Sequence, residues 1–253
     1  MEISSCELYL FLRNIHYYEE GIYEIIKDLV LFKFKYNQKL KNAVDIWCKD
    51  REKGKKVYGH ISLWDVSMIT DMSFLFEGTD FNDNINDWDV SNVENMSNMF
   101  NDCIKFNQPL DKWDVGNVKY MDSMFYECWD FELSISNWDV SNVKNMYCMF
   151  HGTVKFNQSL DKWDVSKVED MDFMFYECNN FNQDISKWDI SKVKTMQWMF
   201  FACEYFVQDL SDWDVSNVEN MEWIFYGCNF ICHSLEKWIP KIQNEADKKY
   251  IEI

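Results

Sequence analysis

Histidine and glycine are scarce in this chain, and each scarcity narrows the chemistry that the chain can perform. The 253 residues include four histidines, namely His16, His60, His151 and His233. These histidines neither recur at a fixed spacing nor pair with a cysteine or serine in an obvious way. With only seven glycines, no phosphate-cradling glycine loop is present. Enzymatic chemistry therefore has little support, and we expect no catalytic residues, no cofactor and no bound metal.

Long apolar runs are also missing. No stretch approaches the roughly 18 consecutive apolar residues that a membrane-spanning helix needs, so we expect no membrane span. The first 20 residues have no basic start and no small-residue cleavage site, so we expect no secretory signal. The nine cysteines are an odd number, and five of them share one place in a repeat. This arrangement favours reduced thiols in the core over a disulfide framework.

Positive charge is scarce in most of the chain. Residues 1–60 hold 9 acidic and 11 basic residues, whereas residues 64–238 hold 31 acidic and 11 basic residues, a net charge of −20. The hydrophobic content of 47% is enough for a substantial core, so the charge belongs to the surface of a folded array. An acidic surface repels phosphate backbones, so we expect no nucleic-acid partner. It favours a basic protein partner or cations.

A tryptophan recurs at nearly constant spacing through the middle of the chain. The gaps are 24 residues once and then 25 residues six times. A fixed period of this length marks a stack of repeats, in which each unit buries its apolar side against its neighbours. We therefore divide the chain into a helical N-terminal cap (1–60), a seven-coil repeat (61–238) and a C-terminal cap (239–253). The recurring residues are Trp64, Trp88, Trp113, Trp138, Trp163, Trp188, Trp213 and Trp238.

Two helices are expected before the first coil. Apolar residues fall at helical spacing within 22–30 and again at Leu40, Val44 and Trp47. The second helix, within 37–52, is well placed to cover the open end of the stack, because an uncovered terminal coil exposes core and backbone edge.

Each coil is expected to contain a short helix and a short strand. After Trp138, the residues Val143, Met146 and Met149 have helical spacing, and Ser141 stands where an N-cap is expected. The following segment, with the pattern FNQxLxxWDV, is expected to be extended, with short parallel strands stacked at about 4.8 Å per coil. The sequence thus predicts an α/β repeat of about seven 25-residue coils. Capping-box pairs are expected at Ser91 and Glu94, Ser166 and Glu169, and Ser216 and Glu219.

The repeat carries a resemblance to a known family. Its pattern WDVSNVxNMxxMFxxCxxFNQxLxx resembles the bacterial surface-protein repeat of Mycoplasma-type lipoproteins, and its MFxxCxxF portion is similar to BspA-like leucine-rich repeats. The resemblance implies a leucine-rich-repeat-like solenoid with a role in adhesion or protein interaction and no catalytic residues. Such repeats also occur in protists and large DNA viruses. Because the signal and the lipid-anchor cysteine motif are missing, we expect an intracellular or virion-associated protein rather than one at the cell surface.

Two methionine columns and one cysteine column are expected inside the stack, where a column means the equivalent residues of successive coils. The methionine columns are Met72, Met96, Met121, Met146, Met171, Met196 and Met221, and Met99, Met124, Met149, Met174 and Met199. Methionine is an adaptable core filler, and a copper or haem role would need His or Cys partners in the same layer. In the cysteine column, Thr79 and Thr153 replace cysteine in two coils, which favours a small buried side chain over a zinc site. The cysteines are Cys103, Cys128, Cys178, Cys203 and Cys228.

An aspartate follows each of the first seven recurring tryptophans. Stacked like charges repel, so each carboxylate must make a local interaction that outweighs this cost or share a counterion. The favoured interpretation is an Asx-turn, in which the carboxylate accepts the backbone N–H two residues further on. A ladder of calcium sites is the alternative. The residues are Asp65, Asp89, Asp114, Asp139, Asp164, Asp189 and Asp214.

The leading functional hypothesis is a non-enzymatic protein-interaction or structural assembly module with an elongated acidic face. Specificity is expected at the variable positions just before each tryptophan. Exposed rings at Trp129, Trp198, Tyr205 or Trp223 could add affinity, although a core role for them is equally open. A carbohydrate-binding or carbohydrate-active protein and a calcium-dependent adhesin are the alternatives, and the oligomeric state is left open. The candidate binding residues are Asn86, Asp87, Asp111, Lys112, Ser136, Asn137, Asp161, Lys162, Ser186, Lys187, Ser211 and Asp212.

Overall fold

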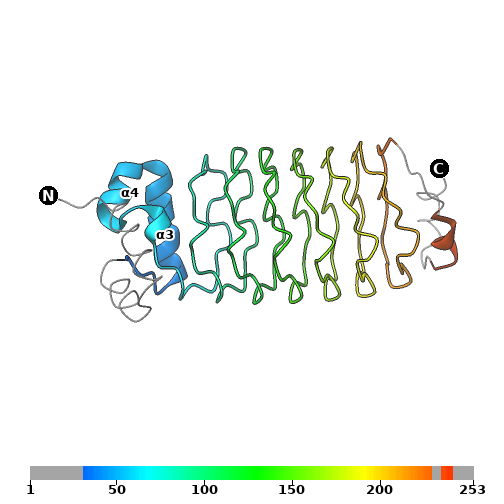
Figure 1. The fold of residues 1–253 in the computed structure, drawn as a ribbon, viewed down its shortest axis with the longest axis horizontal. Helices are drawn as coiled ribbons and strands as arrows, with labels where there is room; N and C mark the ends of the chain where they lie inside the picture. Colours follow the sequence, from blue (N-terminus) through cyan, green and yellow to red (C-terminus); the bar gives the residue numbers. More distant parts are fainter. Residues whose placement is uncertain (1–30, 230–234, 242–253) are drawn as a thin grey trace, which may run out of the picture.

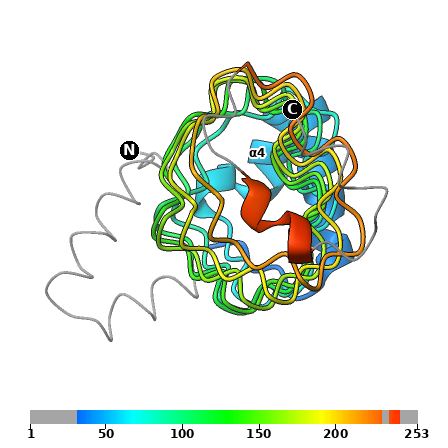
Figure 2. The ribbon, with the colours of Figure 1, turned by 90° about the vertical axis from the view of Figure 1, so that its right-hand side faces the viewer.

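The chain forms a row of stacked coils with two helices at one end (Figure 1). The structure is a computed structural model that describes residues 31–229 and 235–241. Figure 2 looks along the row, where the coils overlie one another as closed loops. Among the described residues, no helix has the length and apolar character needed to cross a membrane. The helical elements are α3 (Asn37–Lys49), α4 (Arg51–Tyr58) and the 3-10 turns η1 (Ile61–Leu63), η2 (Leu235–Lys237) and η3 (Ile239–Lys241).

Helix α3 confirms the second predicted helix. Its apolar residues line one side at the i, i+3, i+4, i+7 spacing of an amphipathic helix. The ring of Trp47 meets Trp64 of the first coil edge-on, with centroids 5.9 Å apart, so α3 packs against the first coil. The predicted helix within 22–30 lies outside the described residues. The buried residues of α3 are Leu40, Ala43, Val44 and Trp47.

Helix α4 is an addition to the helices that the sequence predicts. Asp50 starts it, because its side chain accepts a hydrogen bond from the backbone N–H of Lys53 at 3.0 Å. Gly54 is buried against α3, and a Cβ there would lie 3.1 Å from Cα of Trp47. The close approach of the two helices therefore depends on this glycine.

The coils contain no strand and no helix over residues 64–229. The expected α/β fold is therefore wrong, because it was a leucine-rich-repeat-like solenoid with a short strand and a short helix in each coil. Consecutive tight turns replace the predicted helix. In the coil that begins at Trp138, the N–H of Met149 donates to the carbonyl of Met146 at 3.1 Å, and the N–H of Thr153 donates to that of Phe150 at 2.9 Å. Each bond closes a four-residue turn.

Two residues of each coil have a left-handed backbone, which excludes an α-helix there. In the same coil they are Cys148 (φ 53°) and Gly152 (φ 67°), each the third residue of a hydrogen-bonded turn, as in a type II turn. Chained turns thus reproduce the apolar spacing that predicted a helix, and Ser141 and the capping-box serines start no helix. The corresponding pairs elsewhere are Phe74 and Gly78, Asn98 and Asp102, Ser123 and Glu127, Phe173 and Glu177, Trp198 and Ala202, and Trp223 and Gly227.

The backbone N–H groups that are not used within the turns donate hydrogen bonds to the next coil. The N–H groups of Met146, Cys148, Phe150 and Gly152 donate to carbonyls one coil further on, at 2.7 to 3.0 Å. Alternate N–H groups therefore serve the turn and the neighbouring coil. Single parallel bridges run along the stack in one column, which comprises Asp71, Asn95, Tyr120, Asn145, Asp170, Thr195 and Asn220.

The segment FNQxLxxWDV, predicted as a strand, joins the coils through side chains instead. Oδ1 of Asn182 accepts a hydrogen bond from the backbone N–H of Val207 at 3.0 Å, and Oδ1 of Asn157 accepts one from the N–H of Asn182 at 2.9 Å. Within the described residues, no backbone hydrogen bond joins two coils along this segment. The strand prediction fails because amide side chains provide the acceptors that a neighbouring strand would have provided.

The interior is a stack of equivalent apolar side chains. Rings of one column overlie one another, as for Phe125 and Phe150, whose centroids are 5.7 Å apart and whose planes differ by 7°. Both methionine columns are buried, which confirms their assignment to the core. Because each apolar side chain packs on its counterpart in the next coil, the sequence period becomes a spatial repeat.

Candidate interaction surface

The tryptophan column ties each coil to the one before it. Nε1 of Trp138 donates a hydrogen bond to the carbonyl of Leu110 at 3.0 Å, and its ring stacks on that of Trp113 with centroids 6.3 Å apart. All eight tryptophans of this column are at most 4% exposed. The column therefore builds the stack and is not open to a partner.

The cysteine column has a similar structural role. Sγ of Cys128 donates to the carbonyl of Phe100 at 3.0 Å, and Oγ1 of Thr153 donates to the carbonyl of Phe125 at 2.6 Å. Burial raises the pKa of the Cys103 thiol to about 12, so this thiol is protonated and can donate at neutral pH. Threonine can replace cysteine in this column because both are small donors, and the prediction of a small buried side chain is confirmed for the fully buried members. In the part of the chain that the structure describes, no three His, Cys, Asp or Glu side chains are grouped as metal ligands.

The aspartate column forms the predicted Asx-turns. Oδ1 of Asp139 accepts the backbone N–H of Ser141 at 3.0 Å, and Oδ1 of Asp164 accepts that of Ser166 at the same distance. The Ser166 hydroxyl and N–H hold the pKa of Asp164 below its usual value, so this carboxylate stays ionised well into the acid range. Except for the buried Asp65, the aspartates are exposed on the surface.

Several predicted binding residues, just before each tryptophan, hold neighbouring coils together. Nδ2 of Asn86 donates to Oδ1 of Asp111 at 2.8 Å, and Nδ2 of Asn137 donates to the backbone carbonyl of Asp111 at 2.6 Å. Nζ of Lys112 lies 2.6 Å from Oδ1 of Asp87. These side chains are partly engaged with the neighbouring coil, so they are less available to a partner than the sequence suggests.

Of the remaining predicted binding residues, most are held by hydrogen bonds or an ion pair, and two lysines are not. Nζ of Lys237 reaches Asp212 at 2.8 Å and Oγ of Ser211 at 3.4 Å. The backbone N–H of Ser186 donates to Asp184 within its own coil, at 2.9 Å. Local bonds also hold Ser136 and Asp161, to Ser134 and Ser159 respectively. Lys162 and Lys187 are exposed and form no ion pair with any other residue that the structure describes.

The predicted aromatic anchors lie at the surface, so the alternative of a core role is wrong. Tyr205 is 61% exposed and Trp129 is 47% exposed, with Nε1 of Trp129 bonded to Glu127. Trp198 and Trp223 are half-buried. These rings therefore contribute apolar surface on the outside of the stack.

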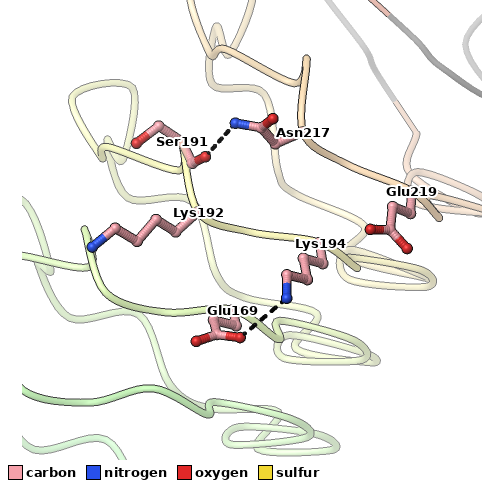
Figure 3. A pocket seen from close by; sticks show the side chains of 6 residues that line it. All are labelled: Glu169, Ser191, Lys192, Lys194, Asn217 and Glu219. Carbon is pink, nitrogen blue, oxygen red and sulfur yellow. Dashed lines mark hydrogen bonds and ion pairs between the residues drawn. The ribbon is translucent and has the colours of Figure 1, made fainter.

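A shallow hollow of about 340 Å³ is lined by residues of the three successive coils that begin at Trp163, Trp188 and Trp213 (Figure 3). Two lysines and two glutamates are among the residues that line it, so their formal charges cancel. Nζ of Lys194 lies 3.4 Å from Glu169, and Nδ2 of Asn217 donates to the carbonyl of Ser191 at 2.7 Å. Its polar groups already join one coil to the next, and nothing in this arrangement points to a specific ligand.

His151 is held in an unusual environment that the sequence analysis missed. Its ring lies between those of Tyr126 and Tyr176, with both centroid distances at 4.4 Å. Nδ1 is buried without a hydrogen-bond partner, and it lies 3.6 Å from Oε1 of Glu127. Burial lowers the pKa of His151, although the Glu127 charge opposes this effect. The recurrence of aromatic residues every 25 positions here is the signal that could have revealed it.

A second titratable group lies in the bridge column. Burial raises the pKa of Asp170 to about 6, and the nearby charges of Asp172 and Asp122 add to the effect. Asp172 is buried and well satisfied, because it accepts hydrogen bonds from Thr195 and from the backbone and side chain of Gln197. Asp170 is thus a carboxylate whose ionised form is disfavoured by its place in the stack.

The repeat region matches the model of a known protein family. The model of a family described as "Mycoplasma protein of unknown function, DUF285" matches residues 48–161 and again residues 126–238. The predicted resemblance to a Mycoplasma-type repeat is therefore confirmed, whereas the match gives no support to its BspA-like leucine-rich-repeat portion. No curated protein and no solved structure matches the chain.

Proposed function

From the premise that this chain belongs to the family described as Mycoplasma protein of unknown function, DUF285, we propose that it is a non-enzymatic protein-interaction module. Its acidic coils bind a basic protein partner or pack into a larger assembly. The partner is a protein rather than a nucleic acid, because residues 64–238 carry a net charge of −20 and repel phosphate.

The observation that carries the proposal is the row of exposed aspartates. Each uses Oδ1 for its own turn, as Asp89 does with the N–H of Ser91 at 3.1 Å. That bond leaves the second carboxylate oxygen and the charge facing solvent. Within the described residues, no ion pair engages the five consecutive members of the row, which are Asp89, Asp114, Asp139, Asp164 and Asp189.

The lysines of the coils do not offset this charge, because several of them already pair with a carboxylate in the preceding coil. Nζ of Lys119 lies 2.7 Å from Glu94, and Nζ of Lys155 lies 2.7 Å from Asp130. Such exposed pairs contribute little stability, but they neutralise one another locally. The acidic excess is therefore concentrated on the carboxylates outside these pairs, where a basic surface can approach.

A pull-down with the tagged full chain from its native source, repeated at rising salt and followed by mass spectrometry, tests the proposal. We expect a defined set of basic proteins or one large particle, released as salt screens the charges. The same proteins should be absent from a pull-down with a tagged basic protein of similar size. Recovery of no protein at low salt, or of neutral and acidic proteins only, would contradict the proposal.

A further inference from the structure

Aromatic side chains form a continuous strip on the outside of the later coils. We call this the aromatic strip, and define it as Phe173, Tyr176, Trp198, Phe201, Trp223 and Tyr226. Along the stack, the rings of Phe173 and Trp198 are parallel within 4° with centroids 6.1 Å apart. Across the strip, Trp198 and Phe201 lie 5.1 Å apart. The side chains thus touch both along and across the stack and form one surface.

The backbone gives no reason for large rings at one edge of this strip. Phe173, Trp198 and Trp223 all have left-handed backbone, with φ between 57° and 59°. This conformation is unfavourable for bulky side chains and is tolerated best by glycine and asparagine. An earlier coil indeed has Asn98 at the same place, with φ 57°. The large half-exposed rings are therefore retained against the local preference, which indicates a role outside the fold.

The charges around the strip have one sign. In the three coils that carry the strip, the paired turns at 171–178, 196–203 and 221–228 contain no lysine or arginine, and their carboxylates are Asp172, Glu177 and Glu222. Glu177 is exposed next to Tyr176, whose pKa is raised by burial and by the Glu177 charge. Glu222 precedes Trp223 and is half-buried.

Within the protein itself, one ring of the equivalent column contacts a basic side chain. Phe74, the first residue of the column that contains Trp198, is 42% exposed. Nζ of Lys41, from helix α3, lies 5.5 Å from the centre of its ring. This is a cation–π contact between a basic side chain and the same column in the first coil.

We propose that the aromatic strip, together with Glu177 and Glu222, is the surface that holds a Lys/Arg-rich segment of the partner protein. This inference rests on the proposed function and names the place and the chemistry of binding. Lysine and arginine stems pack along such apolar rings while their charged heads reach carboxylates, and a charged head can also lie over a ring face, as Lys41 does over Phe74. The carboxylates beside the rings favour a basic peptide over a neutral glycan.

Fluorescence anisotropy with labelled nona-arginine and the full chain, at about 150 mM NaCl, tests the inference. The first variant is Phe173→Asn/Trp198→Asn, which places at these positions the residue that Asn98 supplies in an earlier coil. The second is Glu177→Gln/Glu222→Gln. Its matched control is Glu169→Gln/Glu219→Gln, in the same two coils but on the face with the charged hollow. Both glutamine pairs change the net charge from −18 to −16, so non-specific attraction cancels in their comparison.

We expect about tenfold weaker binding for the asparagine variant and for the Glu177/Glu222 variant, and wild-type binding for the Glu169/Glu219 control. Equal binding by wild type and all three variants would overturn the inference but leave a diffuse acidic surface, and hence the proposed function, in place. No binding by the wild type would count against both. If the asparagine variant fails to fold, the two glutamine pairs still decide the question.

A second copy of the chain is the competing occupant of the strip, although a net charge of −18 opposes self-association. Light scattering of wild type and the asparagine variant distinguishes the two. We expect the same mass for both. A wild-type dimer that becomes a monomer in the variant would overturn the inference.

Discussion

The indole of Trp163 donates a hydrogen bond to the backbone carbonyl of Ile135, 28 residues earlier in the chain, at 3.2 Å. The same bond recurs in every coil from Trp88 to Trp238. Each coil is thus fastened to its predecessor by a buried side chain of its own repeat. The repeated residues hold the stack, and the residues that vary between coils are left to determine what the surface binds.

Replacing one buried tryptophan should weaken the whole stack. Trp138→Phe removes the bond to the carbonyl of Leu110 and part of the ring that stacks on Trp113. We expect the free energy of unfolding to fall by about 2 to 4 kcal/mol, from the lost bond and the smaller side chain together. Urea unfolding followed by circular dichroism measures this change. Wild-type stability would show that the indole bond does not hold the coils together.

The cysteine column offers a substitution whose control is already present in the chain. Cys128→Thr should be nearly neutral, because Thr153 makes the same bond to a backbone carbonyl one coil later. Cys128→Ala should cost about 1 to 2 kcal/mol, because the carbonyl of Phe100 loses this donor and a small cavity opens. Urea midpoints of the two variants provide the comparison. Equal destabilisation by both changes would mean that the donor is unimportant.

Asp170 should destabilise the protein at neutral pH. The pKa of Asp170 in the folded state is raised to about 6 from the ordinary 3.8. The folded state therefore binds the proton more tightly than the unfolded state does. The stability that comes from this tighter proton binding is lost as pH rises from about 4 to about 6. Asp170→Asn, which copies Asn145 in the preceding coil, should therefore raise stability at pH 7. We expect about 1 to 2 kcal/mol, because solvent screens a half-buried carboxylate.

Thermal unfolding at pH 4 and pH 7 measures this effect. The gain in melting temperature from Asp170→Asn should be present at pH 7 and small at pH 4, where the wild-type carboxyl is protonated. A gain of the same size at both values would mean that repulsion and burial of the charge are not its cause.

His151 should make the protein less stable in mild acid. Its folded pKa lies below the ordinary 6.5, so the unfolded state takes up the proton more readily and stability falls as pH drops below that value. His151→Tyr continues the stacked column between Tyr126 and Tyr176 and removes the titration. The melting temperature should fall less between pH 7 and pH 5 in the variant than in the wild type. Identical slopes in the two proteins would exclude His151 as the source.

The period of the sequence predicted the stacking of the coils but not their backbone. Spacing placed the tryptophan, methionine and cysteine columns inside, because identical side chains one period apart must meet when coils stack. The helix and the strand of each coil were wrong, because apolar spacing of three and four residues fits chained turns equally well. Only Gly152 and a few equivalent residues hint at the left-handed positions. At Glu127 and Trp198 the bonds to the next coil impose a conformation that local preference opposes.

The candidate surface was predicted in part. The acidic excess and the Asx-turns followed from composition and spacing, since both depend on residues close together in the chain. The proposed specificity positions, such as Asn86 and Asn137, turned out to bond to the neighbouring coil, which no single-coil pattern can show. The strip from Phe173 to Tyr226 was visible only as isolated rings, because its continuity depends on which side chains of successive coils point outward.

The salt dependence of binding by the wild-type chain tests the central claim, that acidic coils recognise a basic protein segment, most directly. Labelled nona-arginine would be titrated with the full chain at NaCl concentrations from about 50 to about 500 mM, with labelled nona-glutamate as control. We expect that nona-arginine binds at low salt, that Kd rises steadily by at least about tenfold across the range, and that nona-glutamate does not bind. Binding of nona-glutamate, or no binding of nona-arginine at the lowest salt, would contradict it.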